Sequence, residues 1–325
     1  MHTPAEINQM LQNKISAIPL PKEPQSLYEP IVYSLATGGK RIRPLLCVLS
    51  ANLFTATISD DILWPAIGLE TFHGFTLLHD DIMDHADIRR GKPTVVKKWG
   101  ENIAILSGDA MLIQAYTFMS KAPAEKLPRI LECFNRVAAL VCEGQQYDME
   151  NAEKCLSGEQ EYLSMIRLKT AVLLAEVCHI GAILGNAPDE DALNMSSFGE
   201  NLGMAFQLQD DLLDTFGDEK SFGKKIGGDI LEGKQTFLVA KTLQCLNEED
   251  ALSFKTLLKD ESRNETDKIA AIKEVYSRCQ IEALTLSKIN HYFSLAMDSL
   301  SKVKVEKKSI EHLENFAHEL LNRQF

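Results

Sequence analysis

The sequence predicts an all-α fold in which the helices pack as one bundle. Apolar residues recur every three or four positions along most of the chain, which is the spacing of a helix with a buried face. No run of alternating β-branched residues bounded by hairpin turns is evident. No segment rich in proline, glycine or serine divides the chain, so we expect a single all-helical domain, residues 1–325.

Helical periodicity is clearest in seven segments, and the residues that flank them are helix-end signals. Ser59 precedes the second segment, Gly185 follows the fifth, and Pro188 precedes the sixth. The polar stretch 247–268 lacks this periodicity, so we predict a loop or a mobile insertion there. The seven predicted helices are residues 44–56, 62–85, 103–121, 126–152, 159–184, 191–215 and 235–247.

The composition is that of a soluble globular protein, and it disfavours several partners. The chain has 325 residues, 45% of them hydrophobic, which is ample for a large core. A net charge of −12 argues against nucleic acid or an anionic membrane as a partner, although local basic clusters could still bind a small anion. Seven cysteines without a Cys-x-x-Cys pair indicate reduced thiols. With no signal peptide and no apolar stretch as long as a membrane span, we expect a cytoplasmic protein.

The stretch "LLHDDIMDHADIRRGKPT" places four aspartates directly after an apolar run. On a helix Asp80 and Asp84 share one face, and like charges at that spacing cost about 0.2–0.5 kcal/mol per pair. A solvated acidic face is the simplest interpretation of such a cluster. The apolar residues before it, including Leu69 and Leu78, instead indicate a buried helix, so we expect a ligand that offsets the repulsion.

The same acidic spacing occurs again in "GMAFQLQDDLLDTFGD", where Asp210, Asp211 and Asp214 follow another apolar run. Two D-D-x-x-D segments that each end a core helix could face one another and surround hard cations. Mg²⁺ held by a few carboxylates usually completes its coordination with water and substrate phosphates. An EF-hand loop is disfavoured, because neither segment has the glycine and the terminal glutamate of that motif.

Phosphate ligands require cations, and basic residues adjoin both acidic motifs. Each one alone is more often a surface residue than a ligand, but together they could hold two diphosphates, with arginine suited to bidentate contact. His73 lies two helical turns before Asp80 and so shares its face, which leaves a core role and a binding role equally open. The basic candidates are Lys40 and Arg43 in "GGKRIRP", Arg89 and Arg90, Lys169 beside Thr170, and Lys224 and Lys234.

These motifs resemble those of the trans-isoprenyl diphosphate synthases, the polyprenyl synthetase family. The resemblance runs from "GGKRIRP" through "LLHDDIMD" and "RRGKPT" to "FQLQDDLLD" and "FGKKIGGDILEGKQT", in the order found in that family. It covers about residues 38–240. It implies the isoprenoid synthase fold, a helical bundle around a deep central cavity, and a homodimer. It also implies a Mg²⁺-dependent prenyltransferase that binds three ions with the allylic diphosphate.

The resemblance also assigns roles to individual residues. Isopentenyl diphosphate would be bound by Lys40, Arg43, His73 and Arg90. The principal metal ligands would be Asp80, Asp84 and Asp210, supported by Asp81 and Asp214, with Asp211 completing the catalytic carboxylates. The allylic diphosphate and the developing cation would be surrounded by Arg89, Lys169, Thr170, Gln207, Lys224 and Lys234, of which Lys169 and Lys234 are also assigned to catalysis.

Three other functions share part of this pattern. A terpene cyclase would keep the fold and the first acidic motif but need not keep "GGKRIRP" and "RRG". A non-catalytic partner subunit would be expected to lose one acidic motif, and this chain has both. A helical cation-binding scaffold would explain the aspartates but not the basic residues. We therefore favour condensation of isopentenyl diphosphate with dimethylallyl, geranyl or farnesyl diphosphate.

The length of the product is predicted from the residues before the first acidic motif. In the family a bulky residue four or five positions before that motif commonly limits the growing chain, and here those positions are Thr76 and Phe75. Phenylalanine at the fifth position resembles enzymes that make C15–C20 products, with a long-chain polyprenyl diphosphate synthase as the alternative. Ideal helical spacing, however, places Thr76 rather than Phe75 on the face of Asp80. Phe72, one turn earlier, could form a second floor.

Overall fold

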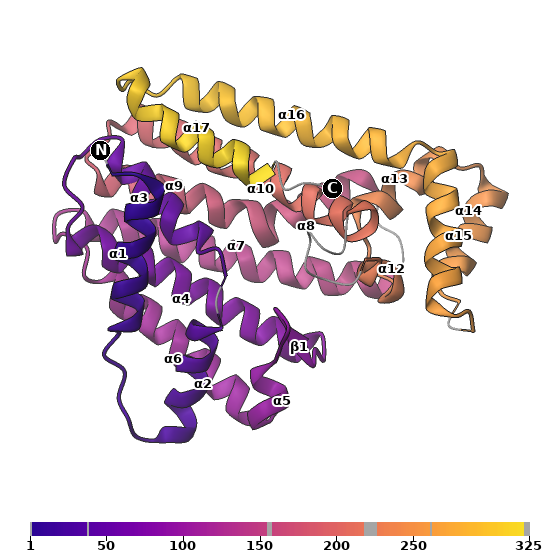
Figure 1. Cartoon of the computed structure of the whole chain (residues 1–325), viewed down its shortest axis with the longest axis horizontal. Coiled ribbons are helices and arrows are strands. Elements are labelled where there is room, and N and C mark those ends of the chain that lie inside the picture. Colours follow the sequence, from indigo (N-terminus) through magenta and orange to yellow (C-terminus); the bar gives the residue numbers. More distant parts are fainter. Residues whose placement is uncertain (1, 38, 155–157, 218–225, 261, 322–325) are drawn as a thin grey trace. The chain divides into compact units, whose positions relative to one another are not determined.

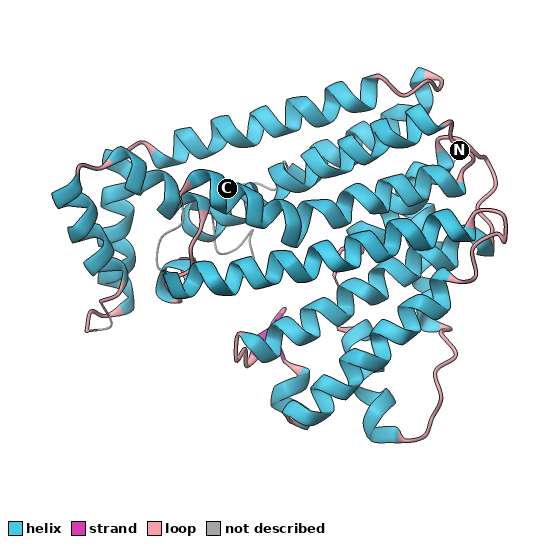
Figure 2. Cartoon of the chain, turned by 180° about the vertical axis from the view of Figure 1, so that it is seen from behind, coloured by secondary structure: helices cyan, strands magenta, loops and turns pink. Residues whose placement is uncertain are grey.

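Helices make up nearly all of the regular structure in this computed structural model (Figure 1; Figure 2). It describes every residue except 1, 38, 155–157, 218–225, 261 and 322–325. The predicted all-α class is confirmed for the described residues. The α-helices are α1 (Pro4–Ser16), α2 (Gln25–Ala36), α3 (Ile42–Asn52), α4 (Asp60–Met83), α5 (Val95–Trp99), α6 (Glu101–Met119), α7 (Leu127–Lys154), α8 (Glu159–Ile166), α9 (Val172–Leu184), α10 (Asp189–Phe216), α12 (Gly228–Leu231), α13 (Phe237–Cys245), α14 (Glu248–Leu258), α15 (Glu265–Arg278), α16 (Ile281–Ser301) and α17 (Lys307–Leu321).

The chain divides into two compact units, each assembled from three stretches of sequence. The first acidic motif belongs to the first unit and the second acidic motif to the second. The expectation of a single domain stays a prediction. The first unit comprises Met1–Phe134, Val177–Leu193 and Lys304–Leu313, and the second comprises Asn135–Glu176, Asn194–Val303 and Glu314–Phe325.

Close contact between α4 and α6 organises the core of the first unit. Gly108 of α6 lies against the ring of His79, since a Cβ there would be 2.2 Å from the imidazole Nε2 atom. Gly68 of α4 likewise leaves room for Met119, whose sulfur would be 2.8 Å from a Cβ. The buried cluster beside these helices also takes Ile31 and Leu35 from α2. These contacts hold the part of α4 that leads into the first acidic motif.

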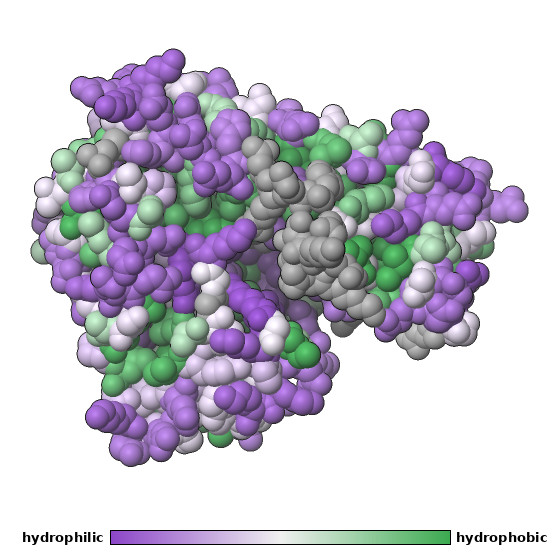
Figure 3. Space-filling model, in the orientation of Figure 1, coloured by the Kyte–Doolittle hydropathy of each residue, from purple (hydrophilic) through white to green (hydrophobic). Residues whose placement is uncertain are grey.

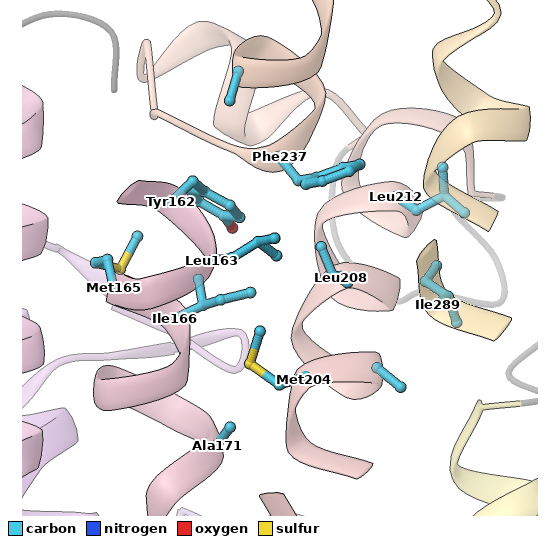
Figure 4. Close-up of a cluster of buried hydrophobic side chains, with 12 residues drawn as sticks. Tyr162, Leu163, Met165, Ile166, Ala171, Met204, Leu208, Leu212, Phe237 and Ile289 are labelled. Atoms are coloured by element: carbon cyan, nitrogen blue, oxygen red, sulfur yellow. The ribbon is translucent and has the colours of Figure 1, made fainter. Parts of the chain in front are cut away.

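The second unit has its main apolar cluster where α8, α10, α13 and α16 meet. Figure 4 shows Tyr162 of α8, Leu208 of α10 and Phe237 of α13 pointing into this cluster, and Ile289 of α16 lies at its edge. Tyr162 and Phe237 are 3% and 0% exposed. The cluster continues along α10 as far as Leu212, so the second acidic motif is carried on a buried helix.

The prediction of a loop at residues 247–268 is wrong. This stretch forms α14 and the first turn of α15, and α14 packs on a second apolar cluster. The side chains of Asn247 and Asn264 each accept a hydrogen bond from the backbone N–H three residues later and so cap these helices. Phe254 and Leu258 are buried, and Tyr276 lies beside Phe254. With only two buried apolar residues in α14, the periodic signal was too weak to outweigh the polar composition.

A short β-hairpin, β1 (Ile88–Arg89) and β2 (Lys92–Pro93), follows the first acidic motif. Its strands pair Ile88 with Pro93 and Arg89 with Lys92. The turn residues Arg90 and Gly91 have φ of 54° and 71°, as expected for a type I′ turn. No alternating pattern marks this hairpin in the sequence, because two-residue strands are too short to show one.

Several helices lie outside the seven predicted segments, namely α1, α2, α5, α12, α14, α15, α16 and α17. None of the described helices combines the length and the apolar character that crossing a membrane requires. Hydrophilic residues cover most of the visible surface (Figure 3), as expected when the apolar residues are used in the two cores.

Candidate active site

Arg89 offsets the repulsion between the aspartates of the first acidic motif. Its Nε atom donates to the Oδ1 atom of Asp81 at 2.6 Å, and an Nη atom lies 3.4 Å from a carboxylate oxygen of Asp80. Asp81 is 5% exposed, whereas Asp84 is exposed at the end of α4. Burial raises the pKa of Asp81, the Arg89 guanidinium lowers it, and Asp80 and Asp84 raise it. The hairpin thus places the guanidinium of Arg89 beside the carboxylates of Asp80 and Asp81.

The fourth aspartate of this stretch belongs to a different interaction. Asp87 forms a surface ion pair with Lys97, 2.9 Å between the charged atoms, and its backbone carbonyl accepts the N–H of Thr94. It closes the loop before α5. Among the four aspartates, Asp80, Asp81 and Asp84 therefore form the candidate site.

The "GGKRIRP" segment passes directly over Arg90. Gly39 has φ of 147°, and a Cβ added to it would lie 2.6 Å from the Nη1 atom of Arg90. The backbone conformation favours glycine here, and any side chain would also displace the Arg90 guanidinium. Lys40 is exposed and Arg43 partly buried. Two segments that are about fifty residues apart in sequence thus bring their predicted diphosphate ligands together.

His73 is a neutral imidazole among arginines. Burial lowers its pKa well below the ordinary value, and the positive charges of Arg43, Arg90, Arg89 and Arg41 lower it further. Because the protonated form is disfavoured, one ring nitrogen remains a hydrogen-bond acceptor and the other a donor. His73 lines a pocket together with Asp81, Arg89 and Arg90, so the structure places these predicted site residues in one cavity.

The same pocket contains two charged residues that the sequence reasoning missed, Arg41 and Glu70. Arg41 Nη1 donates to Glu70 Oε1 at 2.7 Å, and both side chains are almost fully buried. Two signals could have indicated this pair. Arg41 directly follows Lys40, and Glu70 is a lone charge within an otherwise apolar stretch of α4, three residues before His73.

The second acidic motif ends α10, as predicted, and its aspartates differ in environment. Asp210 is partly buried, whereas Asp211 is 4% exposed. The carboxylate of Asp211 accepts hydrogen bonds from the Tyr162 hydroxyl, from Gln207 Nε2 at 3.1 Å and from the backbone N–H of Phe237 at 3.3 Å. Burial raises the pKa of Asp211 to about 7 and Asp229 raises it too, while these hydrogen bonds lower it. Asp211 therefore anchors α8 and α13 to α10.

Asp214 connects the motif to the segment that carries Lys234. Its Oδ2 atom accepts the backbone N–H of Asp229 at 2.9 Å, and its carbonyl accepts that of Gly227 at 2.6 Å. The Nζ atom of Lys234 lies 3.7 Å from a carboxylate oxygen of Asp229, a residue that the sequence reasoning missed. Lys224, which was also predicted, lies outside the described residues.

Lys169 and Thr170 lie on a π-helical turn, η1 (Arg167–Ala171), within what was predicted as one continuous helix. Such turns occur frequently at functional sites. Lys169 Nζ lies 2.6 Å from a carboxylate oxygen of Asp148, and the Thr170 hydroxyl donates to Gln207 at 3.2 Å. The turn lies against Gly144 of α7, where a Cβ would be 2.3 Å from the backbone nitrogen of Lys169.

Of the candidate chain-length residues, Phe72 and Phe75 pack on one another, and Thr76 makes a separate contact within α4. The Phe75 ring packs on His79, 4.7 Å between ring centroids, and joins the apolar cluster with α2 and α6. Thr76 lies one turn before Asp80, and its hydroxyl donates to the carbonyl of His73. Phe72 is buried against Phe134 and Phe75.

The donors of the two motifs suit a hard divalent cation. In the first unit Asp80 and Asp84 supply carboxylate oxygens that are not fully buried, and in the second unit Asp210 does so. Water and phosphate could complete the coordination of a cation bound to such groups. Asp81, Asp211 and Asp214 are the buried members, and each accepts a hydrogen bond from the protein. The division into principal and supporting metal ligands stays a prediction.

Comparison with known proteins places the chain in a family. The family model for polyprenyl synthetase matches residues 24–276. A geranylgeranyl diphosphate synthase of Sulfolobus acidocaldarius is 38% identical over 320 residues, which cover 95% of this chain and 94% of that protein.

Solved structures agree with this result. A crystal structure of a geranylgeranyl pyrophosphate synthase superposes with a TM-score of 0.94 at 38% identity and covers 100% of both chains. A geranylgeranyl pyrophosphate synthase from Corynebacterium glutamicum, in complex with isoprenyl diphosphate and magnesium, gives a TM-score of 0.83 at 26% identity and covers 99% of this chain and 97% of the other. The chain therefore belongs to the polyprenyl synthetase family and is a prenyltransferase, an isoprenyl diphosphate synthase.

Proposed function

We propose that the protein condenses isopentenyl diphosphate with an allylic diphosphate in a Mg²⁺-dependent reaction that releases diphosphate. The observation that carries the proposal is the pair of acidic motifs near the ends of helices, each with lysine or arginine side chains in its unit that pair with carboxylates. The relatives named above are geranylgeranyl diphosphate synthases, and one of their structures contains isoprenyl diphosphate and magnesium.

Lys40, Arg43, His73 and Arg90 bind isopentenyl diphosphate in this proposal. Arg43 and Arg90 supply planar guanidinium groups that suit bidentate phosphate contact. The neutral ring of His73 donates one hydrogen bond without adding a further charge beside the arginines. The approach of Gly39 to Arg90 supports a single binding site for these groups.

The acidic motifs and the remaining cations hold the allylic diphosphate. Asp80, Asp84 and Asp210 are the principal ligands of a three-ion Mg²⁺ cluster, and Asp81 and Asp214 support them. The metal supplies charge neutralisation as the diphosphate leaves, which lowers the cost of an allylic cation. Arg89, Lys224 and Lys234 add positive charge at the diphosphate, and the Lys169–Thr170 turn and Gln207 border the developing cation.

The reaction requires no side-chain nucleophile. The allylic C–O bond breaks, and its electron pair leaves with the diphosphate. The double bond of isopentenyl diphosphate then forms the new C–C bond, and the departing diphosphate takes the proton that is lost. Because an allylic cation reacts with water, the apolar residues around the site serve to exclude solvent.

The proposed product is C15–C20, farnesyl or geranylgeranyl diphosphate. Phe75 limits the chain, with Thr76 and Phe72 beside it. The names of the relatives favour the C20 end of this range. A long-chain polyprenyl diphosphate synthase remains the alternative, and product length is the measurement that separates the two.

A homodimer is also part of the proposal. The helix α6 exposes large apolar side chains, with Leu106 60% and Ile113 68% exposed, and these residues lie seven positions apart on one face. Ile105 and Tyr116 extend the apolar surface. A second copy that covers this face would bury these side chains. Light scattering that reports a monomer at micromolar concentration would contradict this assignment.

The test is to incubate the purified protein with isopentenyl diphosphate, Mg²⁺ and each of dimethylallyl, geranyl and farnesyl diphosphate, and then to size the products. We expect linear prenyl diphosphates that end at C15 or C20. Cyclic hydrocarbons would favour a terpene cyclase, products beyond C25 would reject the short-chain assignment, and no condensation with any substrate would reject the proposal.

A further inference from the structure

We infer that the buried Arg41–Glu70 pair is a positioning device for the isopentenyl diphosphate site, an inference that rests on the function proposed above. Neither residue is assigned to contact substrate. The pair instead fixes the backbone that carries Lys40 and Arg43, and it does so from the helix that carries His73.

Arg41 is held by several contacts at once. One Nη atom donates to Glu70 at 2.7 Å, and the other donates to the carbonyl of Leu35 near the end of α2. Its side chain is 6% exposed, so the guanidinium lies inside the protein. Arg41 therefore joins the end of α2, the start of α3 and the middle of α4.

The backbone of Arg41 explains why such an anchor is needed. Arg41 has φ of 48° and precedes the first residue of α3. This left-handed conformation is unfavourable for a residue with a side chain, and it persists only where the surroundings enforce it. Lys40 is the preceding residue and Arg43 is two residues on, so the conformation at Arg41 sets the direction of both.

Glu70 supplies the fixed end of the anchor. It shares a face of α4 with His73 and Gly74, and all three line the pocket that also contains Arg41 and Arg90. Burial lowers the pKa of Arg90, while the Glu70 carboxylate raises it and Arg41 lowers it, so Glu70 acts on both arginines. Glu70 thus binds the loop before α3 and lies in the same pocket as Arg90 of the hairpin turn.

A similar ion pair lies nearer the C-terminal end of α4. There the carboxylate of Asp81 receives Arg89, the neighbour of Arg90, just as Glu70 receives Arg41 between Lys40 and Arg43. In each case a buried carboxylate of α4 binds an arginine adjacent to a predicted diphosphate ligand. Loss of Glu70 would release the loop without removing any predicted ligand of the diphosphate.

The variants Glu70→Gln and Arg41→Lys test this inference under steady-state conditions. Glu70→Gln keeps the shape and an acceptor oxygen but removes the charge, and Arg41→Lys keeps the charge but loses the two-pronged contact. We expect the KM for isopentenyl diphosphate to rise by about tenfold or more in both. The kcat at saturating isopentenyl diphosphate and the KM for the allylic substrate should stay within about threefold of wild type.

Asp191→Asn is the matched control for lost stability. Asp191 is a buried carboxylate of the same unit, 1% exposed, and it accepts the backbone N–H of Lys304. It does not line the pocket that contains Glu70. Its variant should lower the melting temperature with both KM values unchanged. If Glu70→Gln does not fold, Glu70→Asp, which keeps the charge at shorter reach, should show the same selective rise in KM.

The outcomes separate this inference from the function on which it rests. No condensation by the wild-type protein would reject the proposed function itself. With an active wild type, an unchanged KM for isopentenyl diphosphate in both variants would overturn the positioning role. An equal rise in both KM values, or the same rise in Asp191→Asn, would overturn it as well, because it would indicate a general loss of structure.

Discussion

Replacing Gly144 with alanine should selectively damage the turn that carries Lys169. The added Cβ would lie 2.3 Å from the backbone nitrogen of Lys169, 2.6 Å from the carbonyl carbon of Leu168 and 2.7 Å from the Cα of Lys169. Ordinary contacts require about 3.5 Å or more, so α7 and the π-helical turn must separate by about 1 Å. Neither side can yield by rotating a side chain, because all three atoms belong to the backbone.

The magnitude follows from the size of this displacement. Overpacking of this kind costs about 1–3 kcal/mol of stability. A displacement of about 1 Å in a positioning group can reduce the rate by about a hundredfold. Lys169 Nζ is 2.6 Å from Asp148, and Thr170 binds Gln207, so moving the turn disturbs both contacts. We expect a fall in kcat of about 10–100-fold.

The assay is steady-state kinetics together with thermal unfolding, and Gly185→Ala is the control. A Cβ at Gly185 would lie 2.5 Å from the carbonyl oxygen of Ala51, a similar backbone clash in the other unit, and neither residue belongs to an acidic motif. It should lower stability with little change in kcat. Wild-type kcat in Gly144→Ala, or an equal loss of kcat in Gly185→Ala, would refute the reasoning.

Three further predictions concern the substrates, the product and the thiols. Arg89→Ala should chiefly raise the KM for the allylic diphosphate and Arg90→Ala that for isopentenyl diphosphate, and kinetics with the reverse pattern would exchange the two roles. Phe75→Ala should lengthen the product by one or more C5 units, as sized by chromatography, and an unchanged distribution would place the floor of the cavity elsewhere. Burial raises the pKa of Cys178 to about 12, so at pH 8 an alkylating reagent should label exposed Cys142 and spare Cys178 in the folded protein, as mapped by mass spectrometry.

Local patterns explain why much of the helical fold could be predicted. The segments that carry the acidic motifs are buried helices, and their apolar residues recur with helical spacing over many turns. The prediction of a loop at 247–268 was wrong because α14 buries only Phe254 and Leu258 and is mostly polar elsewhere. The hairpin at residues 88–93 could not be predicted, because its pairing depends on a tight turn at Arg90 and Gly91 and leaves no periodic pattern in the sequence.

The site divides in the same way between local and distant determinants. The spacing of Asp80 and Asp84 is a property of one helix and can be read directly from the sequence. The environment of Asp211 cannot, because its partner Tyr162 is 49 residues away in the sequence. The Arg41–Glu70 pair spans 29 residues and depends on the packing of the loop before α3 against α4.

The measurement that tests the central claim most directly is turnover of Asp80→Asn and Asp210→Asn across a Mg²⁺ titration, with circular dichroism to confirm the helical fold. Each change removes one charged oxygen ligand that acts in the ionisation step, so turnover should fall by about a hundredfold or more. EDTA should abolish wild-type activity, and added Mg²⁺ should restore it. Asp87→Asn, which alters an aspartate of the same stretch paired with Lys97 at the surface, should behave as wild type. Wild-type turnover in both Asp80→Asn and Asp210→Asn at limiting Mg²⁺ would contradict the two-motif metal site.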